Sequence, residues 1–333
     1  MIASSGRHYR NLALSLIGED LVKRGWAPAV EGRSRVWTFT SPDGKTWTTS
    51  ASTLRYPFIS PKLIAFAKDK VQAQQYVAGL GFMVPATLEV TAVIPECFDF
   101  LHVHQRMVVK PFDGFGSRGL SLGVIHPNQL TSAVTAALQY SDRVLLQRQF
   151  IGDEIRLTVI DGRVRSILMK QTAQIIGDGK HTVRELIKYE NSERVAASTP
   201  LLSYPALSRD MLELPVERLD DIIAAGEVCK IGSSSLVSKG ACLYEVNDTT
   251  HATYKDIAIT IADKLQAPFL IVDLIVYDHT QSAREDNYVF LEINTSPALK
   301  MYYGARNRVY FDIVSVLGAM INRHYHEHSG IDT

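Results

Sequence analysis

The stretch from Val289 to Ala298 most constrains what this chain can fold into. It begins as an apolar run typical of a β-strand, and it breaks at Pro297. Side chains two residues apart on a strand share a face, so Glu292 and Asn294 should point the same way. A carboxylate and an amide oxygen held side by side suit Mg²⁺, which prefers hard oxygen ligands. Taken alone, however, the pattern is more typical of an edge strand with a polar face that ends in a turn.

A further acidic residue lies inside the apolar run Phe269–Val276. This residue, Asp273, would be buried in a β-strand, and burying a lone carboxylate is costly unless it is paired or binds a cation. The next strand along the chain carries Glu292 and Asn294. We therefore expect Asp273 to share a metal ion with these two side chains.

The composition of the 333-residue chain excludes several classes of function. Lys and Arg together number 35, as do Asp and Glu, so no overall basic charge recruits nucleic acid or a membrane surface. The three cysteines show no CxxC spacing, so we expect neither a disulfide nor a zinc framework. The apolar stretch Leu12–Ile17 is too short for a signal peptide, and nothing approaches a membrane span. These features predict a cytoplasmic protein of two or three domains.

The first part of the chain predicts a small α+β unit. Residues 9–25 carry apolar side chains at a helical period that ends at a glycine. Val36–Thr40 and Thr46–Thr48 alternate around a Pro-Asp-Gly turn, as in a β-hairpin. A Ser-Pro pair at residue 60 then opens a helical region that reaches Gly79. The small α+β unit before this helical region carries no residues that can be tied to chemistry.

A glycine-rich segment, residues 113–119, lies between two β-type runs, Met107–Pro111 and Leu120–Val124. Its glycines let backbone N–H groups approach a phosphate closely. Lys110, at the end of the first run, is placed to neutralise phosphate charge. The segment returns into a β run rather than a helix, so neither the Walker A motif nor the Rossmann fingerprint fits. A phosphate-binding loop and a mobile hairpin loop are equally compatible with this pattern.

A predicted helix at 128–140 precedes two β-type runs that form a hairpin. Gly152–Ile160 and Val164–Lys170 flank an Asp-Gly turn. Glu154 and Arg156 share one face of the first run, which is usual for a sheet exposed on one side.

Less regular sequence follows this hairpin. A Gly-Asp-Gly turn at 177–179 precedes a helix that begins at Thr182. We expect a short amphipathic helix near 216–224 and a long helix at 251–266. Residues 226–247 are rich in Gly and Ser, and composition does not separate an anion-binding loop from a flexible one.

Taken in order, these motifs resemble those of the ATP-grasp ligases. The most specific stretch, Gly152 to Val183, is similar to the GD-x-R strand and GDG-x-x-T-V turn in the ATP-grasp modules of cyanophycin synthetase and bifunctional glutathione synthetases. The run Glu292–Leu299 resembles their EVNAxPG-type ending and the EANTSPG of D-alanine–D-alanine ligases. The resemblance covers about residues 65–320, and the motifs are specific together rather than singly.

The resemblance implies an ATP-grasp fold of the α+β (α/β) class. Two α+β subdomains would clasp ATP beside a small N-terminal domain. We therefore expect an N-terminal α+β domain at 1–64, a lid-bearing subdomain at 65–147, a C-terminal subdomain with the metal and substrate sites at 148–325, and a tail at 326–333.

The resemblance also implies how ATP is bound. Lys70 and Lys110 would contact its phosphates while the 113–119 loop closes over them. The segment Gln147–Phe150 would supply the adenine-binding hinge, and Glu154 would reach the ribose. The implied nucleotide-binding residues are Lys70, Lys110, Gly114, Gly116, Ser117, Arg118, Gly119, Gln147, Arg148, Phe150 and Glu154.

The implied metal ligands are Asp273, Glu292 and Asn294, which would hold two Mg²⁺ ions, with Mn²⁺ as an alternative. Arg156 and Lys170 would be the catalytic residues and face the transferred phosphate. The implied chemistry is phosphorylation of a carboxylate by ATP, followed by attack of an amine on the acyl phosphate. Cationic groups suit that reaction because negative charge builds on the transferred phosphoryl oxygens.

Three functions are compatible with these features. The leading interpretation is an ADP-forming carboxylate–amine ligase with small amino-acid-like substrates. A peptide- or protein-directed ligase, which adds residues to a chain end or closes a macrolactam, is the main alternative. A non-catalytic nucleotide-binding regulator is the third, and the complete metal set argues against it. We expect small-molecule carboxylate and amine partners, no nucleic acid, no membrane, and a homodimer as the candidate assembly.

Four departures from the family pattern lie on the substrate side. Lys230-Ile231-Gly232 stands where relatives have Leu-Arg-Gly, and residues 235–240 stand where they have Asn-Leu-Ser-x-Gly-Gly. Ala298 replaces a glycine, and Tyr302 replaces a frequent histidine. These changes predict an unusual acceptor. Candidate pocket residues, each equally expected on the surface or in the core, are Lys239, Lys300, Tyr302, Tyr303 and Arg306.

Overall fold

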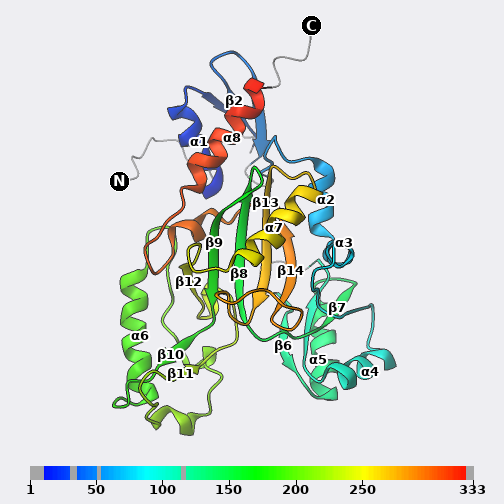
Figure 1. Ribbon diagram of the computed structural model, residues 1–333, viewed down its shortest axis with the longest axis vertical. Helices are drawn as coiled ribbons and strands as arrows, with labels where there is room; N and C mark the ends of the chain where they lie inside the picture. Colours follow the sequence, from blue (N-terminus) through cyan, green and yellow to red (C-terminus); the bar gives the residue numbers. More distant parts are fainter. Residues whose placement is uncertain (1–10, 31–35, 51–53, 114–117, 328–333) are drawn as a thin grey trace.

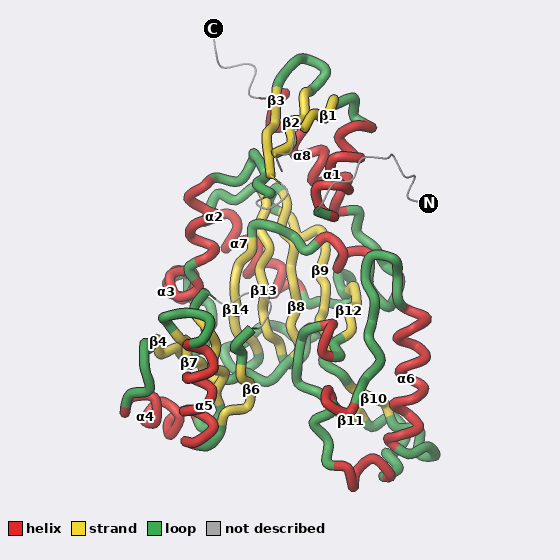
Figure 2. Tube along the Cα trace, turned by 180° about the vertical axis from the view of Figure 1, so that it is seen from behind, coloured by secondary structure: helices red, strands yellow, loops and turns green. Residues whose placement is uncertain are grey.

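A five-stranded antiparallel sheet forms the centre of the molecule (Figures 1 and 2). The computed structural model describes residues 11–30, 36–50, 54–113 and 118–327. The strands, in sheet order, are β12 (Cys242–Glu245), β9 (Arg163–Gln171), β8 (Asp153–Ile160), β13 (Phe269–Val276) and β14 (Tyr288–Asn294). Helix α7 (Ala252–Lys264) packs across the sheet against β8, β9 and β13.

The predicted hairpin of β8 and β9 is confirmed. Asp161 and Gly162, which join the strands, both have positive φ angles, 49° and 70°. This turn geometry matches the right-handed twist of the flanking strands. The polar face of β8 is not exposed, however, because Glu154 and Arg156 are both only 8% exposed. Other elements cover this face, so an open-faced sheet is the wrong interpretation.

The N-terminal unit contains the predicted helix and hairpin, together with a strand, β1, that was not predicted. It consists of α1 (Leu12–Lys23), β1 (Ala27–Val30), β2 (Val36–Thr40) and β3 (Thr46–Ser50), with β2 and β3 forming the expected hairpin. The C-terminal helix α8 (Ile313–Glu327) lies beside α1 at the top of Figure 1. Trp26 Nε1 donates to Asn322 Oδ1 at 2.9 Å, so the end of the chain completes this unit.

The helical region after Ser60 is two helices rather than one. Ser60 caps α2 (Pro61–Lys68) by accepting from the Leu63 N–H, as expected for a Ser-Pro start. The chain then leaves the helical conformation at Asp69, whose side chain caps α3 (Lys70–Gly79). The break places Lys70 at the N-terminus of a new helix.

The second subdomain has its own four-stranded sheet and its own core, at the lower right of Figure 1. The strands, in sheet order, are β4 (Thr87–Val90), β7 (Val144–Arg148), β5 (Met107–Pro111) and β6 (Ser121–Val124), with α4 (Pro95–His104) and α5 (Pro127–Leu138). We name this subdomain the lid lobe. Gly114, Gly116 and Ser117 lie outside the described residues.

A third body, which we name the small lobe, lies at the lower left of Figure 1 and also has its own core. It contains β10 (Gln174–Ile176), β11 (Val228–Lys230), α6 (Val183–Ala197) and two 3₁₀ turns, η1 (Arg209–Met211) and η2 (Val216–Asp220). Thr182 begins α6 with a capping box to Glu185, as predicted. The helix expected near 216–224 is only the short 3₁₀ turn η2.

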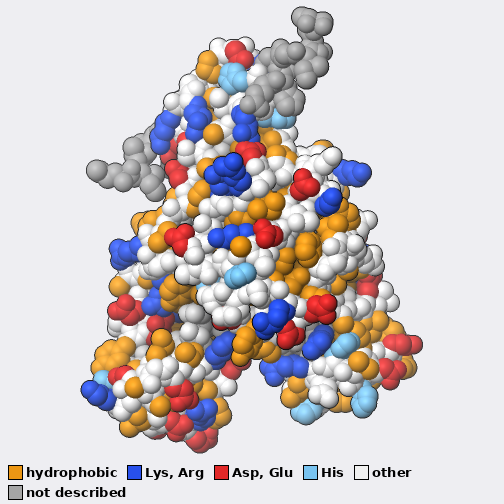
Figure 3. Space-filling model, in the orientation of Figure 1, with side chains coloured by type: hydrophobic (Ala, Val, Ile, Leu, Met, Phe, Trp, Pro, Cys, Tyr) orange, Lys and Arg blue, Asp and Glu red, His pale blue; other side chains and the backbone are white. Residues whose placement is uncertain are grey.

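Two more 3₁₀ turns, η3 (Val237–Lys239) and η4 (Leu299–Tyr303), flank the central sheet. The space-filling view shows the molecule hollowed between the lid lobe and the small lobe (Figure 3). None of the described helices is both long and apolar enough to cross a membrane.

Candidate active site

Six polar residues form a row across four strands of the central sheet. Strand pairing sets Lys170 opposite Glu154, Arg156 opposite Asp273, and Asp273 opposite Glu292. Directly paired residues project from the same face of a sheet. The polar row therefore consists of Lys170, Glu154, Arg156, Asp273, Glu292 and Asn294. All six were expected in the site from the sequence.

A buried ion pair lies at the centre of the polar row. Arg156 donates from Nε to Asp273 Oδ1 at 2.8 Å and from Nη2 to Asp273 Oδ2 at 2.6 Å. Burial alone would raise the pKa of Asp273, but the guanidinium holds it below its usual value. Burial would likewise lower the pKa of Arg156, which the carboxylate instead raises. Arg156 is thus the partner that Asp273 requires, a pairing that the sequence analysis did not propose.

A β-bulge brings Glu292 to the same face as Asp273. Leu274 pairs with Phe290, yet Asp273 pairs with Glu292, so Leu291 is an extra residue in the ladder. In a regular ladder Leu291 would lie opposite Asp273, and Glu292 would face the other side. Asn294 lies beside both acids, because its Nδ2 donates to Asp273 Oδ2 at 2.9 Å and to Glu292 Oε1 at 3.1 Å.

This donor set fits a Mg²⁺ site. The Asn294 amide lies within hydrogen-bonding distance of the carboxylates of Asp273 and Glu292, and all three side chains carry hard oxygens. Among the described residues, no group of three or more His, Cys, Asp or Glu side chains could hold a metal ion. A cation here would therefore also need oxygens from a bound phosphate group, and Mg²⁺ is usually held by carboxylates and substrate phosphates together.

Lys110, on β5 of the lid lobe, lies near the polar row. Burial lowers the pKa of Lys110 to about 8, and the positive charge of Lys70 acts in the same direction. The carboxylates of Glu292 and Glu154 raise the pKa of Lys110, so both lie close enough to interact with its charge. The side chain of Lys110 forms no hydrogen bond with a described residue, so its ammonium group remains available for an anion.

Glu154 is held at both of its carboxylate oxygens. Lys170 Nζ contacts Oε1, and the Ser235 hydroxyl donates to Oε2 at 2.7 Å. Sequence reasoning placed Glu154 and Lys170 in the site but gave Ser235 no role. The signals for Ser235 were its position in a serine-rich loop and its place at the start of residues 235–240, which depart from the family pattern.

Comparison with known proteins shows which enzymes have a similar sequence. No family model matches the sequence. The chain is 27% identical over 275 residues to a glutathione biosynthesis bifunctional protein of Mannheimia succiniciproducens, a match that covers 78% of this chain and 36% of that protein. It is 24% identical over 246 residues to a cyanophycin synthetase of Nostoc sp., covering 72% of this chain and 27% of that protein.

A solved structure shares the fold. The crystal structure of a bifunctional glutathione synthetase from Pasteurella multocida matches 94% of this chain and 43% of that chain, with a TM-score of 0.61 and 20% identity. The chain therefore has the ATP-grasp fold. It has the α+β fold that the sequence motifs predicted, and it spans about a third of the length of the curated relatives it matches.

The residues of the segment expected to bind adenine, Gln147–Phe150, differ in their exposure to solvent. Gln147 is buried, and its Nε2 donates to Gln74 Oε1 at 3.0 Å and to Thr87 Oγ1 at 2.8 Å. Arg148 is exposed and Phe150 is half-buried. Their nucleotide contacts stay predictions.

Gly119, at the end of the expected phosphate loop, has a structural need for glycine. Its φ angle is +69°, and a Cβ there would lie 2.8 Å from Pro111 Cγ and from Tyr140 Cδ2. The neighbouring Arg118 is exposed.

Most residues considered for the acceptor pocket are engaged within the fold. Tyr302 shares a 2.7 Å hydrogen bond with Thr158 and is almost fully buried. Tyr303 donates to Asp312 at 2.9 Å. Arg306 Nη1 donates to Glu190 Oε1 at 2.6 Å. Of the five, only Lys239 and Lys300 are exposed.

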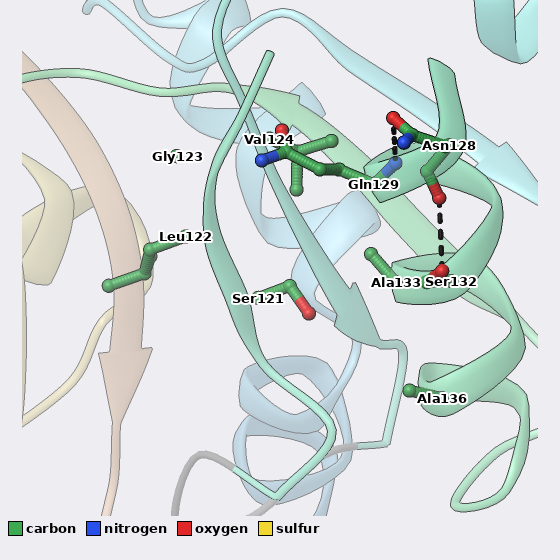
Figure 4. A pocket seen from close by; sticks show the side chains of 9 residues that line it. All are labelled: Ser121, Leu122, Gly123, Val124, Asn128, Gln129, Ser132, Ala133 and Ala136. Carbon is green, nitrogen blue, oxygen red and sulfur yellow. Dashed lines mark hydrogen bonds between the residues drawn. The ribbon is translucent and has the colours of Figure 1, made fainter. Parts of the chain in front are cut away.

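A cavity of about 480 Å³ lies between β6 and α5 in the lid lobe (Figure 4). Polar side chains, among them Ser121, Asn128 and Ser132, surround it. It contains no member of the polar row, and it lacks charged groups. We therefore place the chemistry at the polar row and not in this cavity.

Proposed function

We propose that this ATP-grasp protein is an ADP-forming carboxylate–amine ligase that makes an amide bond through an acyl phosphate. The observation that carries the proposal is the polar row on the central sheet, faced by Lys110 from the lid lobe. Such a row offers cations for phosphoryl oxygens beside oxygen ligands for Mg²⁺. Small amino-acid-like substrates are the proposed class.

Each residue is assigned a role that its surroundings support. Lys70 and Lys110 hold the ATP phosphates. Asp273, Glu292 and Asn294 would hold Mg²⁺, which supplies neutralisation of the phosphate charge when bound.

Arg156 faces the phosphoryl group that is transferred. It uses Nε and Nη2 for Asp273, while the only hydrogen bond of Nη1 with a described residue is to the Met301 sulfur at 3.6 Å, a weak acceptor. Nη1 is therefore the group assigned to the transferred phosphoryl oxygens, which gain charge in the transition state. Lys170, held by Glu154, supports the same charge from the neighbouring strand.

The test is nucleotide turnover with Mg²⁺ and pools of amino acids, dipeptides and amines. We expect ADP and inorganic phosphate to form only when a suitable carboxylate is present, because the acyl-phosphate route cleaves the γ-phosphate. Formation of AMP and pyrophosphate together with product would indicate adenylation and reject the mechanism. Peptide substrates belong in the same screen, since the hollow between the lobes is open (Figure 3).

A further inference from the structure

The triple serine Ser233–Ser235 is an ordered bridge. The Ser233 hydroxyl donates to a Glu213 oxygen at 2.5 Å, and the Ser233 N–H donates to the same oxygen at 3.1 Å. The Ser234 hydroxyl accepts from the Leu236 N–H at 3.2 Å. The Ser235 hydroxyl donates to Glu154 Oε2. Each hydroxyl therefore has a separate partner, which composition alone could not show.

The bridge joins the small lobe to the polar row. Glu213 is fixed to the small lobe, because its N–H donates to the Ile231 carbonyl at 2.9 Å. At the other end, Glu154 is 8% exposed and is gripped between Ser235 and Lys170. A carboxylate held at both oxygens has a fixed orientation, and it still has lone pairs that can accept further hydrogen bonds.

We propose that Ser235 is a positioning residue that sets the preference of the site for a ribonucleotide. The inference rests on the proposed ATP-dependent activity and on the role that the family resemblance implies for Glu154, which is to accept a hydrogen bond from a ribose hydroxyl. Ser235 fixes the Glu154 carboxylate in the orientation that accepts a hydrogen bond from this hydroxyl. The carboxylate therefore loses its conformational entropy before ATP binds and not on binding. Without Ser235, Lys170 alone holds the carboxylate, which can then turn towards the ammonium group and away from the sugar.

The test compares binding of ATP, 2′-deoxy-ATP and 3′-deoxy-ATP, each with Mg²⁺, to the full chain by calorimetry. We expect wild type to prefer ATP over one of the deoxy analogues by about tenfold, the usual strength of a hydrogen bond to a charged group. Ser235→Ala and Ser235→Cys should lose most of that preference. Ser235→Thr, which keeps the hydroxyl, should retain it.

Ser238→Ala is the matched control, because Ser238 is an exposed serine of the same loop whose side chain forms no hydrogen bond with a described residue. It should bind all three nucleotides as wild type does. A merely structural role for Ser235 would weaken all three nucleotides by the same factor, and that result would overturn the inference.

Glu154→Gln separates this inference from the proposed function. If this variant loses the preference for ATP while Ser235→Ala and Ser235→Cys keep it, Glu154 reads the ribose and only the role of Ser235 is rejected. If Glu154→Gln keeps the wild-type preference, the ribose assignment itself fails, and the inference fails with it.

Discussion

Glu292 differs from the other acidic residues of the polar row because it has no ion-pair partner among the described residues. Glu154 is paired with Lys170, and Asp273 is paired with Arg156. Glu292 accepts one hydrogen bond, from Asn294. Its charge is therefore the one most available to a cation.

We expect Glu292→Gln to lower turnover by at least about a hundredfold, because the change keeps the shape of the side chain but removes its charge from the phosphoryl-transfer site. Asn294→Asp keeps an oxygen ligand and should be milder. The measurement is turnover across a Mg²⁺ titration, with a thermal melt to confirm folding. Wild-type activity of Glu292→Gln at ordinary Mg²⁺ would reject both the metal site and the ligase proposal.

The Arg156–Asp273 pair should control stability as well as chemistry. Arg156→Ala would leave the carboxylate of Asp273, which is 0% exposed, without its partner. The free energy of unfolding should fall by about 3–5 kcal/mol, as for other broken buried ion pairs. Arg156→Met combined with Asp273→Leu should recover most of this loss. Urea unfolding of the single and double variants tests the coupling, and equal instability of both would contradict it.

Lys110 should make stability depend on pH in a predictable direction. Its pKa falls from 10.5 to about 8 on folding, so the native state binds fewer protons than the unfolded state between these pH values. The free energy of unfolding therefore rises with pH between these two values, because deprotonation removes the cost of the buried charge. Lys110→Met should be more stable than wild type at pH 7 and lose that advantage by pH 10.5. Urea unfolding at both pH values measures the difference, and a constant difference would show that burial of the charge is not costly.

At the scale of elements, local signals in the sequence predicted most of what the structure contains. The Asp161-Gly162 turn, the Ser60 cap and the Thr182 capping box each specify geometry within a few residues. The break at Asp69 was missed because its neighbours continue a helical pattern on both sides.

The arrangement of the site depends on strand register, which local patterns do not specify. The alternation of side chains along the strand predicted that Glu292 and Asn294 share a face. It is the extra residue Leu291 that puts this face on the same side of the sheet as Asp273. The pairing of Arg156 with Asp273 likewise follows from the order of strands β8 and β13, which are more than a hundred residues apart. Long-range pairing is set by tertiary packing, so the residues of the site were predictable and their contacts were not.

Gly152, the residue directly before strand β8, should tolerate no side chain. A Cβ at Gly152 would lie 2.3 Å from the Val276 carbonyl oxygen, a backbone atom that can move only if β8 and β13 separate. Gly152→Ala should therefore reduce stability by about 2 kcal/mol or more and weaken ATP binding through Glu154. Gly162→Asn, at the other end of β8, is the control, since its site has open space and Asn tolerates a positive φ. Equal effects of the two changes on ATP binding would contradict this account.

At the scale of the whole molecule, the N-terminal unit and the central sheet share one core, whereas the lid lobe and the small lobe have separate ones. The shared core runs from Leu14 and Phe39 through Leu317 of α8 to Phe269 of the central sheet. Helices α1 and α8 also approach closely, because a Cβ at Gly318 would lie 1.8 Å from Asp20 Oδ2. A continuous core of this kind should unfold as one cooperative unit.

The tryptophans allow a direct test of this cooperativity. The three in the chain, Trp26, Trp37 and Trp47, all belong to the N-terminal unit, so their fluorescence reports on that unit alone. Circular dichroism reports on all helices and strands. We expect the fluorescence transition in urea to coincide with the main transition in circular dichroism, and Gly318→Ala to shift both to lower urea by the same amount. An earlier fluorescence transition would mean that the N-terminal unit unfolds independently, as a separate domain at residues 1–64 would.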